Sequence, residues 1–258
     1  MTASYVERLA RRSREAGSYL CVGLDPAAGA PVEAVAAANR ALIEATAPYV
    51  ACYKPNLAFY EQFGIPGLRA LEATLAAIPE GIPVIGDAKR GDIGNTATAY
   101  ARALFEVWGF DAVTASPFLG RDTLEPFLAY EDRGVYVLCR TSNPGAADLQ
   151  NARLASGETV YERIATTAPG WGANVGFVVG ATAPGELRRI RELAPGTSIL
   201  VPGLGAQGGD PEQVMAAAGR EPGLVVVSAS RSIAEAQDQA AAACALRDAL
   251  NAAAVPAP

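Results

Sequence analysis

Residues 83–115 read PVIGDAKRGDIGNTATAYARALFEVWGFDAVTA, and they contain one strand–helix unit followed by the next strand. Residues 83–87 and 111–115 are short, mostly apolar runs, and an amphipathic stretch at residues 95–108 separates them. Hydrophobicity that is continuous rather than alternating predicts strands buried on both faces, as in a parallel sheet covered by helices. This stretch therefore predicts a βαβ unit.

The same unit recurs along the whole chain. Further strands are predicted at residues 19–24, 50–54, 135–140, 174–179, 198–201 and 224–229. Further helices are predicted at residues 31–46, 67–78, 122–130, 159–168, 185–193, 211–218 and 232–254. Eight units in 258 residues predict an α/β fold of the TIM (β/α)8 barrel type, with residues 1–258 forming a single domain. A doubly wound sheet is disfavoured because no G-x-G-x-x-G follows the first strand.

The composition excludes several kinds of chemistry. The chain contains no histidine, so it cannot use Ser-His-Asp triads, Cys-His pairs or zinc sites built on imidazole. Its 27 acidic and 21 basic residues give a net charge of -6, which disfavours nucleic acid or an anionic membrane as a partner. A local basic pocket for a small anionic ligand remains compatible with this charge.

The cysteines and the N-terminal segment indicate where the protein resides. Cys21, Cys52 and Cys139 fall in predicted strands and no C-x-x-C motif occurs, so buried reduced thiols are expected. The first helical stretch carries Glu7 and Glu15, which is untypical of a signal peptide. No apolar run is long enough to span a membrane. We therefore expect a cytoplasmic protein.

Polar side chains gather where the predicted strands end, which in a TIM barrel is the end that carries the active site. Asp87 and Lys89 are two residues apart, so they point to the same face if the strand conformation persists, beside Lys54 of the neighbouring strand. The alternative is a salt-bridged rim in which Asp92 or Asn95 caps the next helix. Two lysines and two carboxylates grouped at a barrel mouth favour a catalytic site.

The loops after the seventh and eighth predicted strands are typical of a phosphate site. Residues 202–209 contain four glycines and Gln207, and Arg231 begins the helix after the last strand. Glycine lets backbone N–H groups approach a ligand, helix N-termini attract anions, and arginine binds phosphate through two parallel hydrogen bonds. The alternative is that the glycines only form a tight turn.

Two further groups of residues are less specific. The loop at residues 141–145, Thr-Ser-Asn-Pro-Gly, could recognise a polar ring through hydrogen bonds, or it could be an Asx turn at Asn-Pro. The aromatic residues Phe59, Tyr60, Trp108 and Trp171 have core-like neighbours, and we interpret them as packing residues.

Together these motifs resemble the orotidine 5'-phosphate decarboxylase family, particularly the subgroup with the signature D-A-K-R-G-D-I found here at residues 87–93. The resemblance extends from CVGLDP at residues 21–26, through YKPN at residues 53–56, to SRS at residues 230–232. It implies decarboxylation of orotidine 5'-monophosphate to uridine 5'-monophosphate and CO2 in de novo pyrimidine biosynthesis, without a metal or cofactor. The shorter pattern D-x-K-x-x-D is shared by related sugar-phosphate barrels.

The resemblance also implies roles for individual residues. The catalytic charged network would consist of Lys54, Asp87, Lys89 and Asp92, with Lys89 as the proton donor to C6 of the pyrimidine. Substrate-binding residues would be Asp25 and Lys54 at the ribose, Ser142 at the pyrimidine, and Pro202, Gln207, Gly208 and Arg231 around the phosphate. The loop around Gln207 would act as a closing lid. Asp92 and Thr96 would be contributed across the interface of a homodimer.

Two other functions are compatible with a barrel of this type. A sugar-phosphate decarboxylase or aldolase relative, working through a magnesium-stabilised enediolate, would use the same D-x-K-x-x-D. It would also be expected to need a metal and a further metal-binding carboxylate after the first or second strand. The second strand offers Lys54 instead, which disfavours a cation in that place. The second is a catalytically inert nucleotide-binding barrel, because fold does not fix function. Retention of every charged position argues against it.

Overall fold

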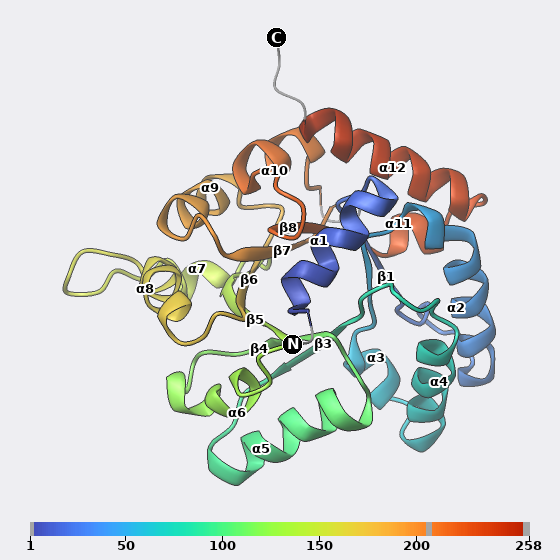
Figure 1. The fold of residues 1–258 in the computed structure, drawn as a ribbon, viewed down its shortest axis with the longest axis horizontal. Helices are drawn as coiled ribbons and strands as arrows, with labels where there is room; N and C mark the ends of the chain where they lie inside the picture. Colours follow the sequence, from blue (N-terminus) through green and yellow to red (C-terminus); the bar gives the residue numbers. More distant parts are fainter. Residues whose placement is uncertain (1–2, 205–207, 255–258) are drawn as a thin grey trace.

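The structure is a computed structural model that describes residues 3–204 and 208–254, and its strands form one parallel sheet surrounded by helices (Figure 1). The strands are β1 (Leu20–Gly23), β2 (Cys52–Lys54), β3 (Ile85–Arg90), β4 (Ala112–Ala115), β5 (Gly134–Arg140), β6 (Val175–Val179), β7 (Ser198–Pro202) and β8 (Val225–Ala229). Their order is β2-β1-β8-β7-β6-β5-β4-β3, and isolated bridges between Tyr53 and Val84 and between Asn56 and Asp87 close the ring. The predicted (β/α)8 barrel is confirmed.

The helices follow the strands as predicted, with local differences. They are α1 (Tyr5–Ala16), α2 (Val32–Thr46), α3 (Leu57–Glu61), α4 (Ile65–Ala76), α5 (Gly94–Arg102), α6 (Glu125–Leu128), α7 (Ala146–Leu149), α8 (Val160–Thr167), α9 (Pro184–Leu193), α10 (Pro211–Ala218), α11 (Arg231–Ala234) and α12 (Gln239–Ala254). No described helix is long and apolar enough to cross a membrane.

Two predicted helices are corrected by local capping chemistry and proline, and one short helix was not predicted. The single helix expected at residues 232–254 is divided into α11 and α12, because the Asp238 carboxylate accepts the Ala241 N–H and starts a new helix. The helix expected at residues 122–130 shrinks to a 3-10 turn and the four-residue α6, which contains Pro126. The five-residue α3 was not predicted, and Asn56 caps its start by accepting the Ala58 N–H.

The barrel has two apolar cores because side chains alternate along each strand. One set packs outward against the helices and includes Val22, Tyr53, Val113, Val135, Phe177, Val201 and Val227. The other set fills the interior with Cys21, Cys52, Ile85, Ala112, Tyr136, Val178, Leu200 and Val226. Strand residues of opposite parity therefore face the helices and the barrel axis, as the pleat requires.

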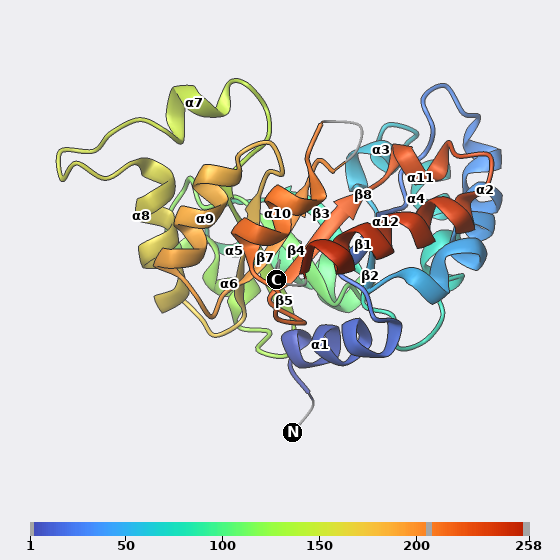
Figure 2. The ribbon, with the colours of Figure 1, turned by 90° about the horizontal axis from the view of Figure 1, so that it is seen from above.

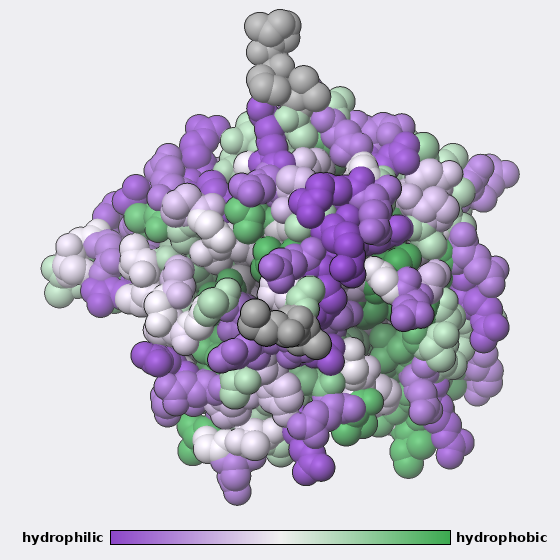
Figure 3. All heavy atoms as spheres, in the orientation of Figure 1, coloured by the Kyte–Doolittle hydropathy of each residue, from purple (hydrophilic) through white to green (hydrophobic). Residues whose placement is uncertain are grey.

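Helix α1 closes the N-terminal end of the barrel. Its Tyr5 and Leu9 are buried in the interior cluster, and the Tyr5 hydroxyl hydrogen-bonds the Tyr136 hydroxyl at 3.1 Å. Figure 2 shows α1 at the end of the molecule opposite α7 and α11. The outer surface over α1 is hydrophilic in Figure 3, so the helix buries one face and exposes the other. The pocket must therefore open at the opposite end.

We expect Leu9→Ala to destabilise the protein by about 2–5 kcal/mol, because it removes a fully buried side chain from the layer that closes the barrel. Equilibrium unfolding in urea measures the change. The matched control is Leu149→Ala, since Leu149 is 64% exposed and its truncation should cost less than about 0.5 kcal/mol. Equal costs for the two variants would show that α1 does not seal the barrel core.

Candidate active site

A pocket of about 1180 Å³ opens at the C-terminal ends of the strands. Its floor is formed by interior residues in the apolar layer and just above it, and these include Lys54, Asp87, Thr114, Leu138, Val178, Leu200, Pro202 and Ser228. Several lie two positions after an apolar interior residue on the same strand, as Lys54 does after Cys52 and Asp87 after Ile85. The two-residue repeat of the strand therefore places polar groups directly above the sealed core.

Asp87 is the centre of the charged group on this floor. Its Oδ2 accepts a hydrogen bond from Lys54 Nζ at 3.0 Å, and its Oδ1 accepts from Lys89 Nζ at 2.6 Å. Oδ1 also accepts from the Thr114 hydroxyl at 2.9 Å. Lys54 and Asp87 are buried, whereas the Lys89 side chain is 47% exposed and faces the open pocket. The predicted grouping of Lys54, Asp87 and Lys89 is confirmed.

The two ammonium groups keep the buried Asp87 carboxyl ionised. Burial alone would raise the pKa of Asp87, but Lys54 and Lys89 hold that pKa well below its ordinary value. Burial alone would lower the pKa of Lys54, but the carboxylates of Asp87 and Asp25 hold it above its ordinary value. Opposite charges outweigh desolvation in both cases, so the pair is charged at neutral pH.

The backbone at Lys89 departs from the strand conformation that the sequence suggested. Lys89 has φ +48°, and among the described residues it is the only one other than glycine with positive φ. The pairing register between β3 and β4 shifts between Gly86 and Arg90, so the strand bulges at this point. Such a conformation costs about 1–3 kcal/mol and is typical of functional sites. The Lys89 and Asp87 side chains meet at this bulge.

The β1 loop lies beside the charged group. Asp25 lines the pocket, and its Oδ1 accepts the Asn56 backbone N–H at 3.0 Å. Asn56 also lines the pocket from the neighbouring loop. Asp25 is thus held by the same segment that follows Lys54, and its carboxylate is one of the charges acting on that lysine.

The residues expected on the far side of the pocket are partly brought to it. Ser142, Pro202 and Arg231 line the pocket, and Arg231 is the first residue of α11 as predicted. Gln207 lies outside the described residues. Gly208 is described and has φ +85°, but it is not among the residues that line the pocket.

Asp92 and Thr96 do not line the pocket of their own chain. The Asp92 carboxylate accepts the backbone N–H of the next residue, Ile93, at 2.8 Å, and Thr96 is exposed in the first turn of α5. The N-cap residue of α5 is Ile93, and no side chain caps this helix, so the helix-cap alternative for Asp92 and Asn95 is wrong. Asp92 is therefore separate from the Asp87 group within one chain.

One wall of the pocket was not predicted from the sequence. It comes from α3 and the residues just after it, where Phe59, Gln62 and Phe63 line the pocket. Phe59 is 41% exposed, so its interpretation as a packing residue is wrong. Tyr60, one position further along, is fully buried, and Trp108 and Trp171 pack against the core as expected. The difference between Phe59 and Tyr60 follows from a short helix that buries only one face.

The loop after β5 is fastened by Gln150, which the sequence did not single out. The Gln150 side-chain oxygen accepts the Thr141 backbone N–H at 2.8 Å, and its amide nitrogen donates to the Thr141 hydroxyl at 2.9 Å. The Thr141 hydroxyl in turn donates to Asn143 Oδ1 at 2.6 Å. This chain of contacts fixes the backbone on both sides of Ser142.

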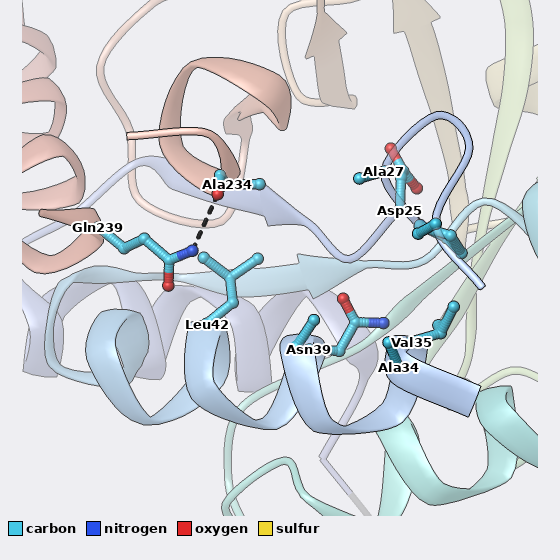
Figure 4. A pocket seen from close by; sticks show the side chains of 11 residues that line it. Asp25, Ala27, Ala34, Val35, Asn39, Leu42, Ala234 and Gln239 are labelled. Atoms are coloured by element: carbon cyan, nitrogen blue, oxygen red, sulfur yellow. Dashed lines mark hydrogen bonds between the residues drawn. The ribbon is translucent and has the colours of Figure 1, made fainter. Parts of the chain in front are cut away.

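A smaller side pocket of about 100 Å³ adjoins the first near Asp25 (Figure 4). It lies between α2 and the segment joining α11 to α12, where Gln239 donates to the Ala234 carbonyl at 2.9 Å. Asn39 lines it, with its amide nitrogen bonded to the Tyr60 hydroxyl at 2.9 Å. The side pocket is mostly apolar and shares Asp25 with the main site.

Residues that could hold a metal ion are not gathered in this site. Within residues 3–204 and 208–254, no three side chains of His, Cys, Asp or Glu type lie close enough to form a metal-binding group. Asp87 directs both of its oxygens to ammonium or hydroxyl donors. The arrangement is suited to binding an anion and to stabilising negative charge that develops beside the two lysines.

The fold and the pocket define a class: a (β/α)8 barrel with a lysine–aspartate–lysine group at the C-terminal mouth. Residues 18–246 match the family described as "Orotidine 5'-phosphate decarboxylase / HUMPS family", and the chain belongs to this family. It is therefore an enzyme of the class that the resemblance implied.

Individual relatives agree with this assignment. The chain is 52% identical to orotidine 5'-phosphate decarboxylase of Haloarcula marismortui over 249 residues, which is 92% of this chain and 89% of the relative. The structure of Leishmania donovani OMP decarboxylase superposes with a TM-score of 0.91 and 44% identity, covering 97% of this chain and 99% of that one. Leishmania donovani UMP synthase gives a TM-score of 0.93 and 45% identity over 98% of this chain, which spans only 57% of that longer protein.

We expect Asp87→Asn to lower the free energy of unfolding by about 3–5 kcal/mol at neutral pH, because Lys54 is left buried without its partner charge. Since the folded-state pKa of Asp87 lies below the unfolded one, its contribution is present above the unfolded pKa and is lost as pH falls. The stability gap between wild type and variant should therefore narrow by about 1 kcal/mol between about pH 5 and about pH 3. Urea unfolding at both pH values measures this change. A stability difference between wild type and variant that is independent of pH would contradict the lowered pKa of Asp87.

Proposed function

We propose that this enzyme decarboxylates orotidine 5'-monophosphate to uridine 5'-monophosphate and CO2 in de novo pyrimidine biosynthesis, without a metal or cofactor. The observation that carries the proposal is the Asp87 carboxylate holding Lys54 and Lys89 on the pocket floor, in a chain that belongs to the family. An enzyme for this reaction needs fixed positive charge where a carbanion forms, because the C6 electron pair lies in the ring plane and cannot delocalise into the π-system.

In the proposed step, the bond between C6 and the carboxylate carbon breaks and its electron pair remains on C6. The Lys89 ammonium donates a proton to C6, which forms the C6–H bond of the product, and neutral CO2 leaves. Lys89 then regains its proton from water. Lys89 suits this role because its side chain is half exposed to the pocket, whereas the Lys54 side chain is buried in the pocket floor.

Asp87 has two effects in this scheme. It orients Lys89 through the 2.6 Å contact, and it places a negative charge beside the substrate carboxylate. Repulsion between the two carboxylates raises the free energy of the bound substrate relative to the transition state, because the repulsion is relieved as CO2 departs. The cost of holding Asp87 ionised is met by its contacts to the two lysines.

The rest of the substrate would be bound across the pocket. We assign the ribose hydroxyls to Asp25 and Lys54, the pyrimidine edge to Ser142, and the phosphate to Arg231 together with Pro202, Gln207 and Gly208. A guanidinium at the start of α11 supplies the charge that a phosphate needs. Binding energy from the phosphate, remote from C6, would be used to orient the reacting carbon. The lid role of the loop around Gln207 belongs to this proposal.

Asp92 and Thr96 would complete the site of a second copy in a homodimer. The loop that holds Asp92 also exposes Ile93, and the neighbouring loop after β4 exposes Phe118 and Leu119. The Ser116 N–H donates to the Arg90 carbonyl at 2.8 Å, so the two loops start side by side. Exposed apolar side chains grouped near a catalytic carboxylate fit an interface with another copy of the chain.

The location of the enzyme also belongs to the proposal. Cys21, Cys52, Cys139 and Cys244 are free, and the first three are buried. Free thiols are typical of a reducing compartment, which supports a cytoplasmic enzyme.

We expect chelator-treated wild-type protein to convert orotidine 5'-monophosphate to uridine 5'-monophosphate at an undiminished rate, because the described residues of the pocket offer ammonium groups and no metal-binding carboxylate cluster. Loss of substrate absorbance and release of CO2 measure turnover. Absence of turnover would contradict the proposal. Loss on chelation with rescue by magnesium would instead favour the enediolate chemistry of a sugar-phosphate enzyme.

We expect Lys89→Ala and Asp92→Ala to restore activity to each other when mixed, because a shared site needs one residue from each chain. Each variant alone should lose more than about tenfold in kcat, and Lys89→Ala should still bind uridine 5'-monophosphate. After subunit exchange, half the dimers are mixed, so about one quarter of all sites carry both native residues. The assay compares the exchanged mixture with each variant alone.

The control for this experiment is the wild type diluted with Lys89→Ala and exchanged in the same way. Mass measurement must show that subunits have exchanged. If they have and the two inactive variants regain no activity, Asp92 acts within its own chain or not at all, and the shared-site assignment is wrong.

A further inference from the structure

We propose that Thr114 is a positioning residue for the decarboxylation, fixing both the Asp87 carboxylate and the strained backbone of Lys89 through one hydroxyl group. This inference rests on the proposed function and deepens it. Thr114 lies on β4, is 1% exposed, and contributes to the pocket floor.

The direction of both hydrogen bonds of Thr114 is fixed by chemistry. Its Oγ1 lies 2.9 Å from Asp87 Oδ1 and 2.9 Å from the Lys89 backbone nitrogen. An ionised carboxylate only accepts and a backbone N–H only donates. The hydroxyl therefore donates its single proton to Asp87 and accepts from Lys89, so no other side-chain group is needed to complete its hydrogen bonding.

The bulge in β3 explains why a side chain is needed here. Regular pairing between β3 and β4 stops after Gly86 and resumes at Arg90. The Lys89 N–H falls inside the interruption, and the residue has φ +48°. The Thr114 oxygen takes the place of the missing backbone acceptor, which stabilises the bulge that turns Lys89 toward Asp87.

The same hydroxyl controls the orientation of the Asp87 carboxylate. Oδ1 receives both the Lys89 ammonium at 2.6 Å and the Thr114 hydroxyl at 2.9 Å, while Oδ2 receives Lys54. Removing the hydroxyl frees the carboxylate to rotate and frees the Lys89 backbone to relax. Both changes displace the ammonium from the position that the proposed proton transfer to C6 requires, and small displacements of this kind cost rate rather than binding.

A second buried threonine, Thr46, provides the comparison. Thr46 is fully buried, and its hydroxyl lies 2.7 Å from the Leu42 carbonyl and 2.9 Å from the Tyr53 hydroxyl. It does not line the main pocket. Thr46→Val therefore reports what the loss of a buried threonine hydroxyl does to folding alone.

The experiment compares Thr114→Val, Thr114→Ser and Thr46→Val with the wild type. Thr114→Val keeps the shape and removes both hydrogen bonds, and Thr114→Ser restores the hydroxyl. Steady-state kinetics on orotidine 5'-monophosphate give kcat and KM, titration gives the affinity for uridine 5'-monophosphate, and thermal unfolding gives stability. Thr114→Ala replaces Thr114→Val in the comparison if the valine variant does not fold.

We expect Thr114→Val to lower kcat by roughly 10- to 100-fold while product affinity changes less than about threefold. Thr114→Ser should recover most of kcat, and Thr46→Val should lose stability without losing kcat. The proposal is overturned if Thr114→Val retains wild-type kcat, if kcat and product affinity fall together, or if serine does not rescue. Failure of the wild type to decarboxylate the substrate would reject the proposed function itself. The wild-type assay therefore separates this outcome from failure of the Thr114 proposal alone.

Discussion

The active end of this barrel depends on one buried carboxylate and the two ammonium groups that it accepts. Asp87 accepts Lys54 on one oxygen and Lys89 on the other. Lys54 and Asp87 are both buried, so removing either charge would strongly destabilise the folded protein. Lys54 and Asp87 also lie on the two strands whose pairing is reduced to isolated bridges, so the ion pair spans the weakest seam of the ring. The same contacts therefore help to close the ring and hold the charges of the proposed catalytic group.

The position of the charges follows from layering inside the barrel. Helix α1 and an apolar layer around Cys52, Ile85 and Tyr136 seal the N-terminal end. Two residues further along most strands, the same face meets the pocket, so Lys54 and Asp87 rest on an apolar layer and face the pocket on the other side. Low polarizability beneath the carboxylate strengthens its interaction with the lysines and fixes the field that a developing carbanion would meet.

Much of this could be predicted from the sequence because the strands are continuous apolar runs that end in polar motifs. The position of all eight strands and the grouping of Lys54, Asp87 and Lys89 follow from that pattern. The bulge at Lys89 and the role of Thr114 do not, because they arise from pairing between strands distant in sequence. Phe59 was misinterpreted because a five-residue helix is too short for its pattern to separate the pocket face from the core face.

The central claim is that the Asp87 carboxyl stays ionised as the pH is lowered, because two ammonium groups flank it. This ionisation can be measured directly. Protein labelled with carbon-13 at the aspartate carboxyl carbons is titrated by NMR, and the Asp87 signal is assigned by its absence in Asp87→Asn. An aspartate carboxyl free of neighbouring charges titrates near a pKa of about 3.9, whereas the Asp87 signal should keep its carboxylate position down to about pH 3. An Asp87 signal that titrates at or above about pH 4 would contradict the account.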